Sequence, residues 1–125
     1  LMQIPIAELG PRSFDIDADV DAVSSVCVVF AKSEALGLLK AGYTKNKVIA
    51  AYCQAMAERV VSLLERIGVE EGFFITGGIA KNPGVVKRIE KLLGIKAMET
   101  KIDSQIAGAL GAALFGYTLQ SKKAA

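Results

Sequence analysis

Hydrophobic side chains recur every three or four residues between Thr44 and Gly68, which is the clearest periodic pattern in the chain. Such spacing puts them on one face of an α-helix, which has 3.6 residues per turn. Thr44 can cap the first turn, and Gly68 can end the helix. We therefore predict a long helix with Cys53 in the core, and its apolar positions are Ile49, Tyr52, Cys53, Met56, Val60, Leu63, Leu64 and Ile67.

Two shorter helices are predicted on either side of it. Residues 31–41 have a helical pattern that Gly42 ends. Asn82 is a good N-cap, Pro83 suits the first helical position, and Gly94 closes the segment. The apolar stripe of this second helix consists of Val85, Val86, Ile89, Leu92 and Leu93.

Short apolar runs predict a small sheet. Residues 73–76 are continuously apolar but too few for a helix, and they end abruptly in two glycines, as expected of a central strand that feeds a tight loop. Residues 95–98 can form an edge strand, and residues 26–30 a buried strand or the entry to a helix. The expected fold class is α/β, with helices packed on a small sheet.

The loop after the predicted central strand is the first candidate site. Gly77 and Gly78 let backbone N–H groups approach a ligand, and the following helix N-terminus favours negative charge. The loop is neither a Walker loop nor a G-x-G-x-x-G fingerprint. The loop at Gly77 and Gly78 is a candidate site for an anion or a nucleotide, and the simpler alternative is a tight connection between strand and helix.

A last helix is predicted after Asp103 or Ser104, either of which can cap it. Gly108 and Gly111 lie inside it, where each costs about 1 kcal/mol relative to alanine. Close packing against the central strand would compensate for that cost. Ordinary helix packing explains the glycines as well.

Composition excludes several classes of function. The formal charge is only +2, and aromatic residues make up 6% with no tryptophan, so we expect neither nucleic acid nor a membrane as a partner. The absence of histidine removes imidazole catalysis and histidine metal sites. The acidic run at residues 15–21 lacks the glycine and glutamate of a calcium loop. We expect residues 1–125 to form one domain of a cytoplasmic protein.

Cys27 is the second candidate site. It lies in an apolar run near a predicted helix start, where the helix dipole favours a thiolate. A lone cysteine is more often a small buried hydrophobic residue, and that alternative stays open here.

Three segments together resemble one family in matching order. They are the stretch from Cys27 to Glu34, the loop from Thr76 to Asn82 and the glycine-containing last helix. The chain is similar to the activators of 2-hydroxyacyl-CoA dehydratases and the ATPase subunits of benzoyl-CoA reductase. These belong to the superfamily of actin, sugar kinases and heat-shock chaperones. The resemblance implies that residues 1–125 are the C-terminal part of the second, ribonuclease-H-like lobe of an actin-like ATPase.

The resemblance also implies cofactors and partners. ATP or ADP with Mg²⁺ would bind at Gly77, Gly78, Lys81, Asn82, Gln105 and Gly108. Cys27 would be a ligand of a four-iron, four-sulfur cluster that is shared with a second ATPase subunit across an interface. The intact protein would pass low-potential electrons to a benzoyl-CoA reductase or a 2-hydroxyacyl-CoA dehydratase.

Parts of the family pattern are absent from this chain. The other ligand cysteine, the phosphate loops and the catalytic carboxylates are expected upstream, so no catalytic residue is assigned and the chain alone should lack both cluster and ATPase activity. Glu58 and Arg59 could reach ribose or adenine, or simply form a solvated helix face. The alternatives are the C-terminal lobe of a sugar or acetate kinase and a non-enzymatic assembly domain.

Overall fold

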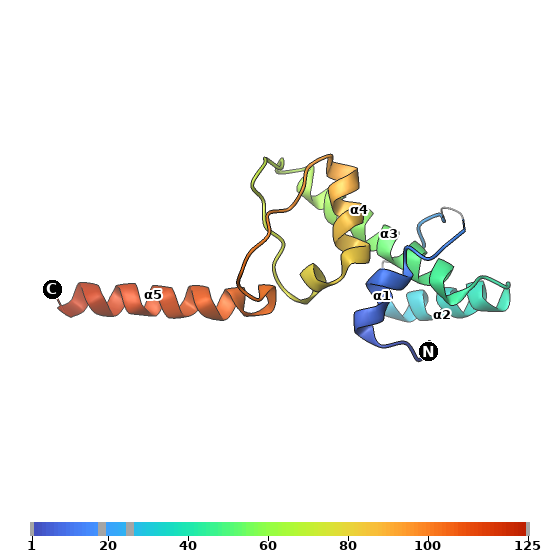
Figure 1. Ribbon diagram of the computed structural model, residues 1–125, viewed down its shortest axis with the longest axis horizontal. Helices are drawn as coiled ribbons and strands as arrows, with labels where there is room; N and C mark the ends of the chain where they lie inside the picture. The colour runs from blue at the N-terminus through green and yellow to red at the C-terminus, as the bar shows by residue number, and fades with distance from the viewer. Residues whose placement is uncertain (1, 18–19, 25–26, 125) are drawn as a thin grey trace.

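The protein is a chain of helices in a computed structural model that describes residues 2–17, 20–24 and 27–124 (Figure 1). No strand is present among these residues. The elements are α1 (Ile6–Arg12), α2 (Val28–Lys40), α3 (Lys45–Leu64), the 3₁₀ turn η1 (Gly78–Lys81), α4 (Pro83–Leu93), the 3₁₀ turn η2 (Ser104–Ile106) and α5 (Ala107–Ala124).

The core lies where α3 packs against α4, and the short helix α1 covers one end of this pair. Partly buried Met2, Ile4 and Leu9 extend the core toward the N-terminus. The prediction that Cys53 belongs to the core is confirmed. The cluster of buried residues consists of Ile49, Cys53, Ala57 and Val61 of α3 with Val85 and Ile89 of α4.

The predicted start of α3 and both predicted ends of α4 are confirmed. Two other boundaries differ, since α2 begins at Val28 rather than at residue 31, and α3 ends at Leu64 rather than at Gly68, which leaves the predicted stripe residue Ile67 outside the helix and exposed. The Thr44 hydroxyl accepts the backbone N–H of Lys47 at 3.2 Å and caps α3. The Asn82 side chain accepts the N–H of Gly84 at 2.9 Å, with Pro83 as the first residue of α4, and Gly94 ends α4 in the left-handed conformation. These boundaries were predictable because each cap involves only neighbouring residues.

The predicted sheet is wrong for the described part of the chain. The extended segments around Phe73 and Met98 run beside each other between the helices (Figure 1), and the Met98 N–H donates to the Phe73 carbonyl at 2.9 Å. The next bond joins the Gly77 N–H to the Ser104 carbonyl at 2.8 Å. Phe73 and Gly77 are four positions apart, whereas their partners Met98 and Ser104 are six positions apart. The two segments therefore keep no common register and form no ladder of β-sheet hydrogen bonds. Of the two alternatives for residues 26–30, the entry to a helix is confirmed for residues 28–30, which begin α2, and residue 26 lies outside the described residues.

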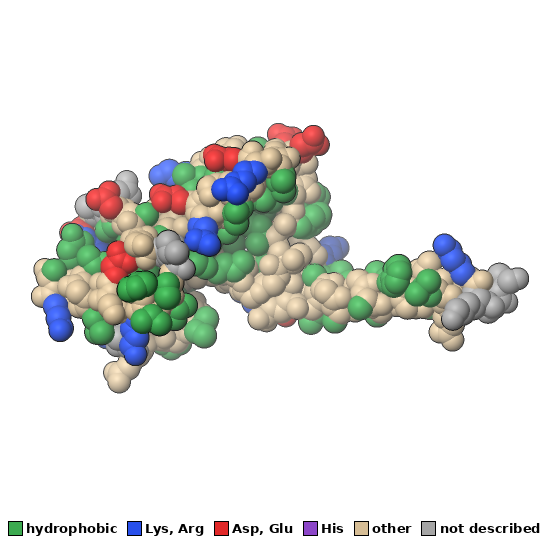
Figure 2. Space-filling view, turned by 180° about the vertical axis from the view of Figure 1, so that it is seen from behind, with side chains coloured by type: hydrophobic (Ala, Val, Ile, Leu, Met, Phe, Trp, Pro, Cys, Tyr) green, Lys and Arg blue, Asp and Glu red, His purple; other side chains and the backbone are tan. Residues whose placement is uncertain are grey.

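Helix α5 extends away from the rest of the molecule (Figure 1), and hydrophobic side chains lie along its surface (Figure 2). Leu114, Phe115 and Tyr117 are 59%, 68% and 73% exposed. No heavy atom lies within 4 Å of a Cβ built on Gly108 or Gly111, leaving out the helix's own backbone. The prediction that these glycines pack closely on a strand is therefore wrong in this structure. Over the described residues, no helix has both the length and the apolar character that crossing a bilayer requires.

Candidate functional site

The glycine loop has a backbone that only glycine adopts readily. Gly77 has φ 84° and ψ −174°, a region closed to side chains by clashes with the backbone. This sharp bend turns the chain from the extended segment into η1, and Asn82 then begins α4. A Cβ built on Gly77 would meet no atom within 4 Å, so the backbone there is open to an approaching ligand.

Hydrogen bonds join the glycine loop to the turn formed by Asp103, Ser104 and Gln105. Lys81 donates from Nζ to Asp103 Oδ2 at 2.8 Å and to Gln105 Oε1 at 2.8 Å. The hydroxyl of Ser104 donates to the Gly77 carbonyl at 3.2 Å. The fold thus brings together four of the predicted contacts, namely Gly77, Gly78, Lys81 and Gln105.

Asp103 is a member of this cluster that the sequence indicated only as a helix cap. The hydrogen bond from Lys81 is the main cause that lowers the pKa of its carboxyl, and the backbone N–H of Gln105 lowers it further. The carboxylate therefore stays charged and holds the lysine ammonium about half-exposed beside the loop. An acidic residue just before Ser104 and Gln105 was the only signal in the sequence for this pairing.

An apolar cavity of about 250 Å³ opens on one side of the loop. Pockets for whole small molecules measure roughly 300 to 1,000 Å³, so this cavity suits a flat apolar part of a larger ligand, such as a base. Its lining comes from the N-terminal segment, α3, the loop and α4. The lining residues are Met2, Leu9, Ile49, Tyr52, Cys53, Met56, Ile79, Asn82 and Val85.

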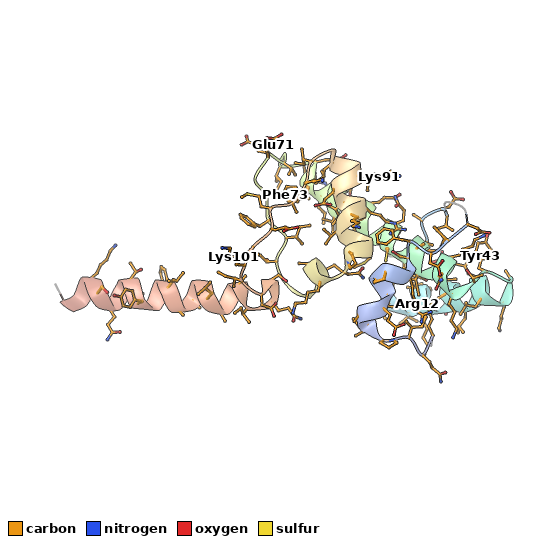
Figure 3. The ribbon with its side chains drawn as sticks, viewed as in Figure 1. Arg12, Tyr43, Glu71, Phe73, Lys91 and Lys101 are labelled. Atoms are coloured by element: carbon orange, nitrogen blue, oxygen red, sulfur yellow. The ribbon has the colours of Figure 1, made fainter. Side chains whose placement is uncertain are left out.

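A larger cavity of about 580 Å³ opens beside Lys81 on the segments between α4 and η2. Charges of both signs line it, among them Lys81, Glu90 and Lys96. Figure 3 shows Phe73 and Lys101 on the two connecting segments that run past this region. The loop thus borders an apolar cavity and a second cavity with a mixed lining that includes lysine and glutamate side chains.

The remaining candidates lie differently from what the sequence suggested. Asn82 uses its side-chain oxygen for the α4 cap, and it lines the apolar cavity. Gly108 is not packed against another element. Glu58 lines a separate cavity of about 720 Å³ beside residues 13–17 and 20–22, and its carboxylate accepts a hydrogen bond from the Gln54 amide at 2.8 Å. The exposed Arg59 lines neither cavity at the loop. A solvated helix face therefore describes Glu58 and Arg59 better than a ligand contact.

Cys27 occupies the N-cap of α2, with a half-buried side chain. Its carbonyl accepts the N–H of Ala31 at 2.8 Å. The first turn that follows is unusually exposed, at 85% for Val28, 69% for Val29 and 72% for Phe30. Among the described residues, no three cysteine, aspartate or glutamate side chains lie together as metal ligands. Cys27 can thus supply at most one ligand of a shared site.

Tyr52 joins the apolar cavity to the helix that carries Cys27. Its side chain lines the cavity, and its hydroxyl donates to the Ala31 carbonyl in the first turn of α2. Burial is the main cause that raises the pKa of Tyr52, and the nearby Glu34 raises it further, so the hydroxyl keeps its proton as a donor. The sequence predicted Tyr52 only as one position of an apolar stripe.

The comparisons with known proteins give one consistent picture. The sequence profile of the BadF/BadG/BcrA/BcrD ATPase family matches residues 1–116. The (R)-2-hydroxyglutaryl-CoA dehydratase activating ATPase of Acidaminococcus fermentans is 41% identical over 117 residues, which are 94% of this chain and 43% of that protein. One of the benzoyl-CoA reductase subunits of Thauera aromatica is 31% identical over 114 residues, covering 87% of this chain and 40% of that relative. The chain spans less than half the length of these relatives.

Solved structures agree in fold. The activator of the 2-hydroxyisocaproyl-CoA dehydratase from Clostridium difficile with bound ADPNP superposes with a TM-score of 0.83 at 32% identity, over 98% of this chain and 46% of that one. Component A of the Acidaminococcus fermentans (R)-2-hydroxyglutaryl-CoA dehydratase gives a TM-score of 0.80 at 35% identity, over 90% and 43%. These neighbours confirm the predicted actin-like ATPase class, although the described residues contain no sheet.

Proposed function

Because this chain belongs to the BadF/BadG/BcrA/BcrD ATPase family, we propose that it supplies the adenosine-binding part of a longer ATPase. The observation that carries the proposal is the glycine loop. Its backbone is open at Gly77, its residues Ile79 and Asn82 line the apolar cavity, and its Lys81 forms the cluster with Asp103 and Gln105. A purine base fits the apolar cavity. The ribose and phosphates then pass the glycines, near the positive N-terminal end of α4.

The solved structure of a relative supports the proposal that this chain binds a nucleotide. The dehydratase activator from Clostridium difficile was solved with ADPNP, an ATP analogue, and this chain superposes on it at a TM-score of 0.83. Mg²⁺ in nucleotide sites is usually held by one or two carboxylates together with the substrate phosphates. As the family resemblance implies, we propose that these carboxylates and the catalytic residues belong to parts of the longer protein outside this chain.

The proposal extends to a four-iron, four-sulfur cluster. Such a cluster needs several thiolates, and the only other cysteine of the chain, Cys53, is buried in the core, where burial raises its pKa. The described residues therefore do not complete a cluster site. Cys27 fits one ligand position, since it lies at a helix N-terminus beside an exposed apolar turn, and the other ligands come from elsewhere in the protein and from a second ATPase subunit.

The exposed turn from Val28 to Phe30 fits that second subunit, because a subunit interface buries such side chains. The intact ATPase would drive electrons into a partner enzyme that acts on an acyl-CoA. That partner is a 2-hydroxyacyl-CoA dehydratase or a benzoyl-CoA reductase, because the chain is 41% and 33% identical to two dehydratase activators and 31% identical to a reductase subunit.

The test uses the full-length protein prepared without oxygen. We expect wild-type protein to bind ADP in calorimetry and to contain iron and sulfide, and Cys27→Ala to lose the iron but keep its ADP affinity. Cys53→Ala is the matched control, and it should keep its iron because Cys53 lies in the core. If Cys27→Ala keeps its iron content, Cys27 is not a ligand of the cluster. If the wild-type protein does not bind ADP, the proposed nucleotide site is wrong.

A further inference from the structure

Tyr52 lies between two features that the proposed function treats separately. One is the apolar cavity beside the glycine loop, which Tyr52 lines together with Ile79 and Asn82 of that loop. The other is the first turn of α2, where the Ala31 carbonyl accepts the Tyr52 hydroxyl. A single side chain thus contacts both the proposed base pocket and the Cys27 helix.

The path from Tyr52 to Cys27 is short. Tyr52 holds the carbonyl of Ala31, and the N–H of the same residue donates to the Cys27 carbonyl at 2.8 Å. Ala31 is therefore fixed on both sides, by the tyrosine and by the N-cap. A displacement of the tyrosine ring would change the position of this turn.

The first turn of α2 has little else to hold it. Within α2, which the structure describes in full, only Ala35 is buried. The residues from Val28 to Phe30 are mostly exposed. A further hydrogen bond to α2 runs from the Ser24 N–H to Glu34 Oε1 at 3.1 Å. An element with so few buried contacts opens at low free energy, so one hydrogen bond can shift its order.

We propose that Tyr52 is a positioning residue that couples a base in the apolar cavity to the order of the Cys27 turn. The proposal rests on the proposed nucleotide site. A bound base packs on the tyrosine ring and restricts it, and the hydroxyl then holds Ala31 and the N-cap in place. Nucleotide binding therefore protects the Cys27 thiol, and the protection needs the hydroxyl rather than the ring.

The experiment measures Cys27 alkylation in iron-free full-length protein. Iodoacetamide is the reagent, the label at Cys27 is quantified by peptide mass spectrometry, and the rate is compared with and without saturating ADP. We expect ADP to slow alkylation of wild-type Cys27 by about fivefold, the scale that one hydrogen bond can supply. In Tyr52→Phe the ratio should fall below about twofold, with ADP added at a concentration that calorimetry on this variant shows to be saturating.

Tyr43→Phe is the matched control, because Tyr43 lies beyond the other end of α2, away from Cys27 and the cavity lining (Figure 3). It should keep the wild-type ratio. If ADP binds wild-type protein without changing the Cys27 rate, or if Tyr52→Phe keeps the full ADP effect, the coupling is overturned and the nucleotide site stands. If ADP fails to bind wild-type protein, the proposed function falls and the coupling with it.

Discussion

Replacement of Gly77 by alanine tests the glycine loop most directly. At φ 84° and ψ −174° an alanine residue is strained, and such conformations cost about 1–3 kcal/mol. No heavy atom lies within 4 Å of the added Cβ, so the whole cost comes from the backbone and not from a clash. If the loop relaxes, it also loses the bonds between Gly77 and Ser104, each worth about 1 kcal/mol.

This strain has to appear in nucleotide binding. A relaxed loop must return to the strained form to bind, so the apparent Kd for ADP rises by about tenfold for each 1.4 kcal/mol of strain. We expect Gly77→Ala to weaken ADP binding by roughly ten- to a hundredfold in calorimetry on the full-length protein. The free energy of unfolding, measured with urea, should fall by about 2 kcal/mol.

Gly42→Ala is the matched control. Gly42 also has a positive φ, of 93°, and also has open space around its Cβ position, but it lies in the turn after α2. It should lose stability and keep its ADP affinity. If Gly77→Ala binds ADP within about twofold of wild type, or if Gly42→Ala weakens binding equally, the loop is not the adenosine site.

Two further substitutions test packing and charge. Gly84→Ala places a Cβ against Ser13 Oγ and should lower the free energy of unfolding, measured in urea, by about 2 kcal/mol. Gly37→Ala has open space around its Cβ and should raise the free energy of unfolding by about 0.5 kcal/mol, so equal effects of the two substitutions would contradict the packing. Lys81→Met should move the pKa of Asp103 up toward 3.8 in an NMR titration. Because the Asp103 pKa is lower in the folded state, the Lys81–Asp103 pair stabilises the fold at pH values above the ordinary Asp pKa, and this stabilisation is lost as the pH falls through the lowered pKa. The variant should therefore not show this loss of stability in acid. An unchanged Asp103 pKa in the variant would show that the pair does not form.

Nucleotide and metal positions were only partly predictable. The glycine loop could be found because a strained backbone needs glycine at a fixed place in the sequence. Lys81 and Gln105 are 24 residues apart, and the sequence named both, although only from a family resemblance. Asp103 and Tyr52 were missed as site residues, since an acidic cap and an apolar stripe position are ordinary features of helices.

The sequence by itself determined where α3 begins and where α4 begins and ends. Thr44, Asn82, Pro83 and Gly94 act on backbone groups within one turn, so their effect does not depend on the rest of the fold. The tertiary structure alone decided the pairing of Lys81 with Asp103, the contact of Tyr52 with Ala31 and the fate of the predicted strands. Each of these needs a partner more than twenty residues away, and in the described chain the extended segments find two bonds out of register instead of a ladder.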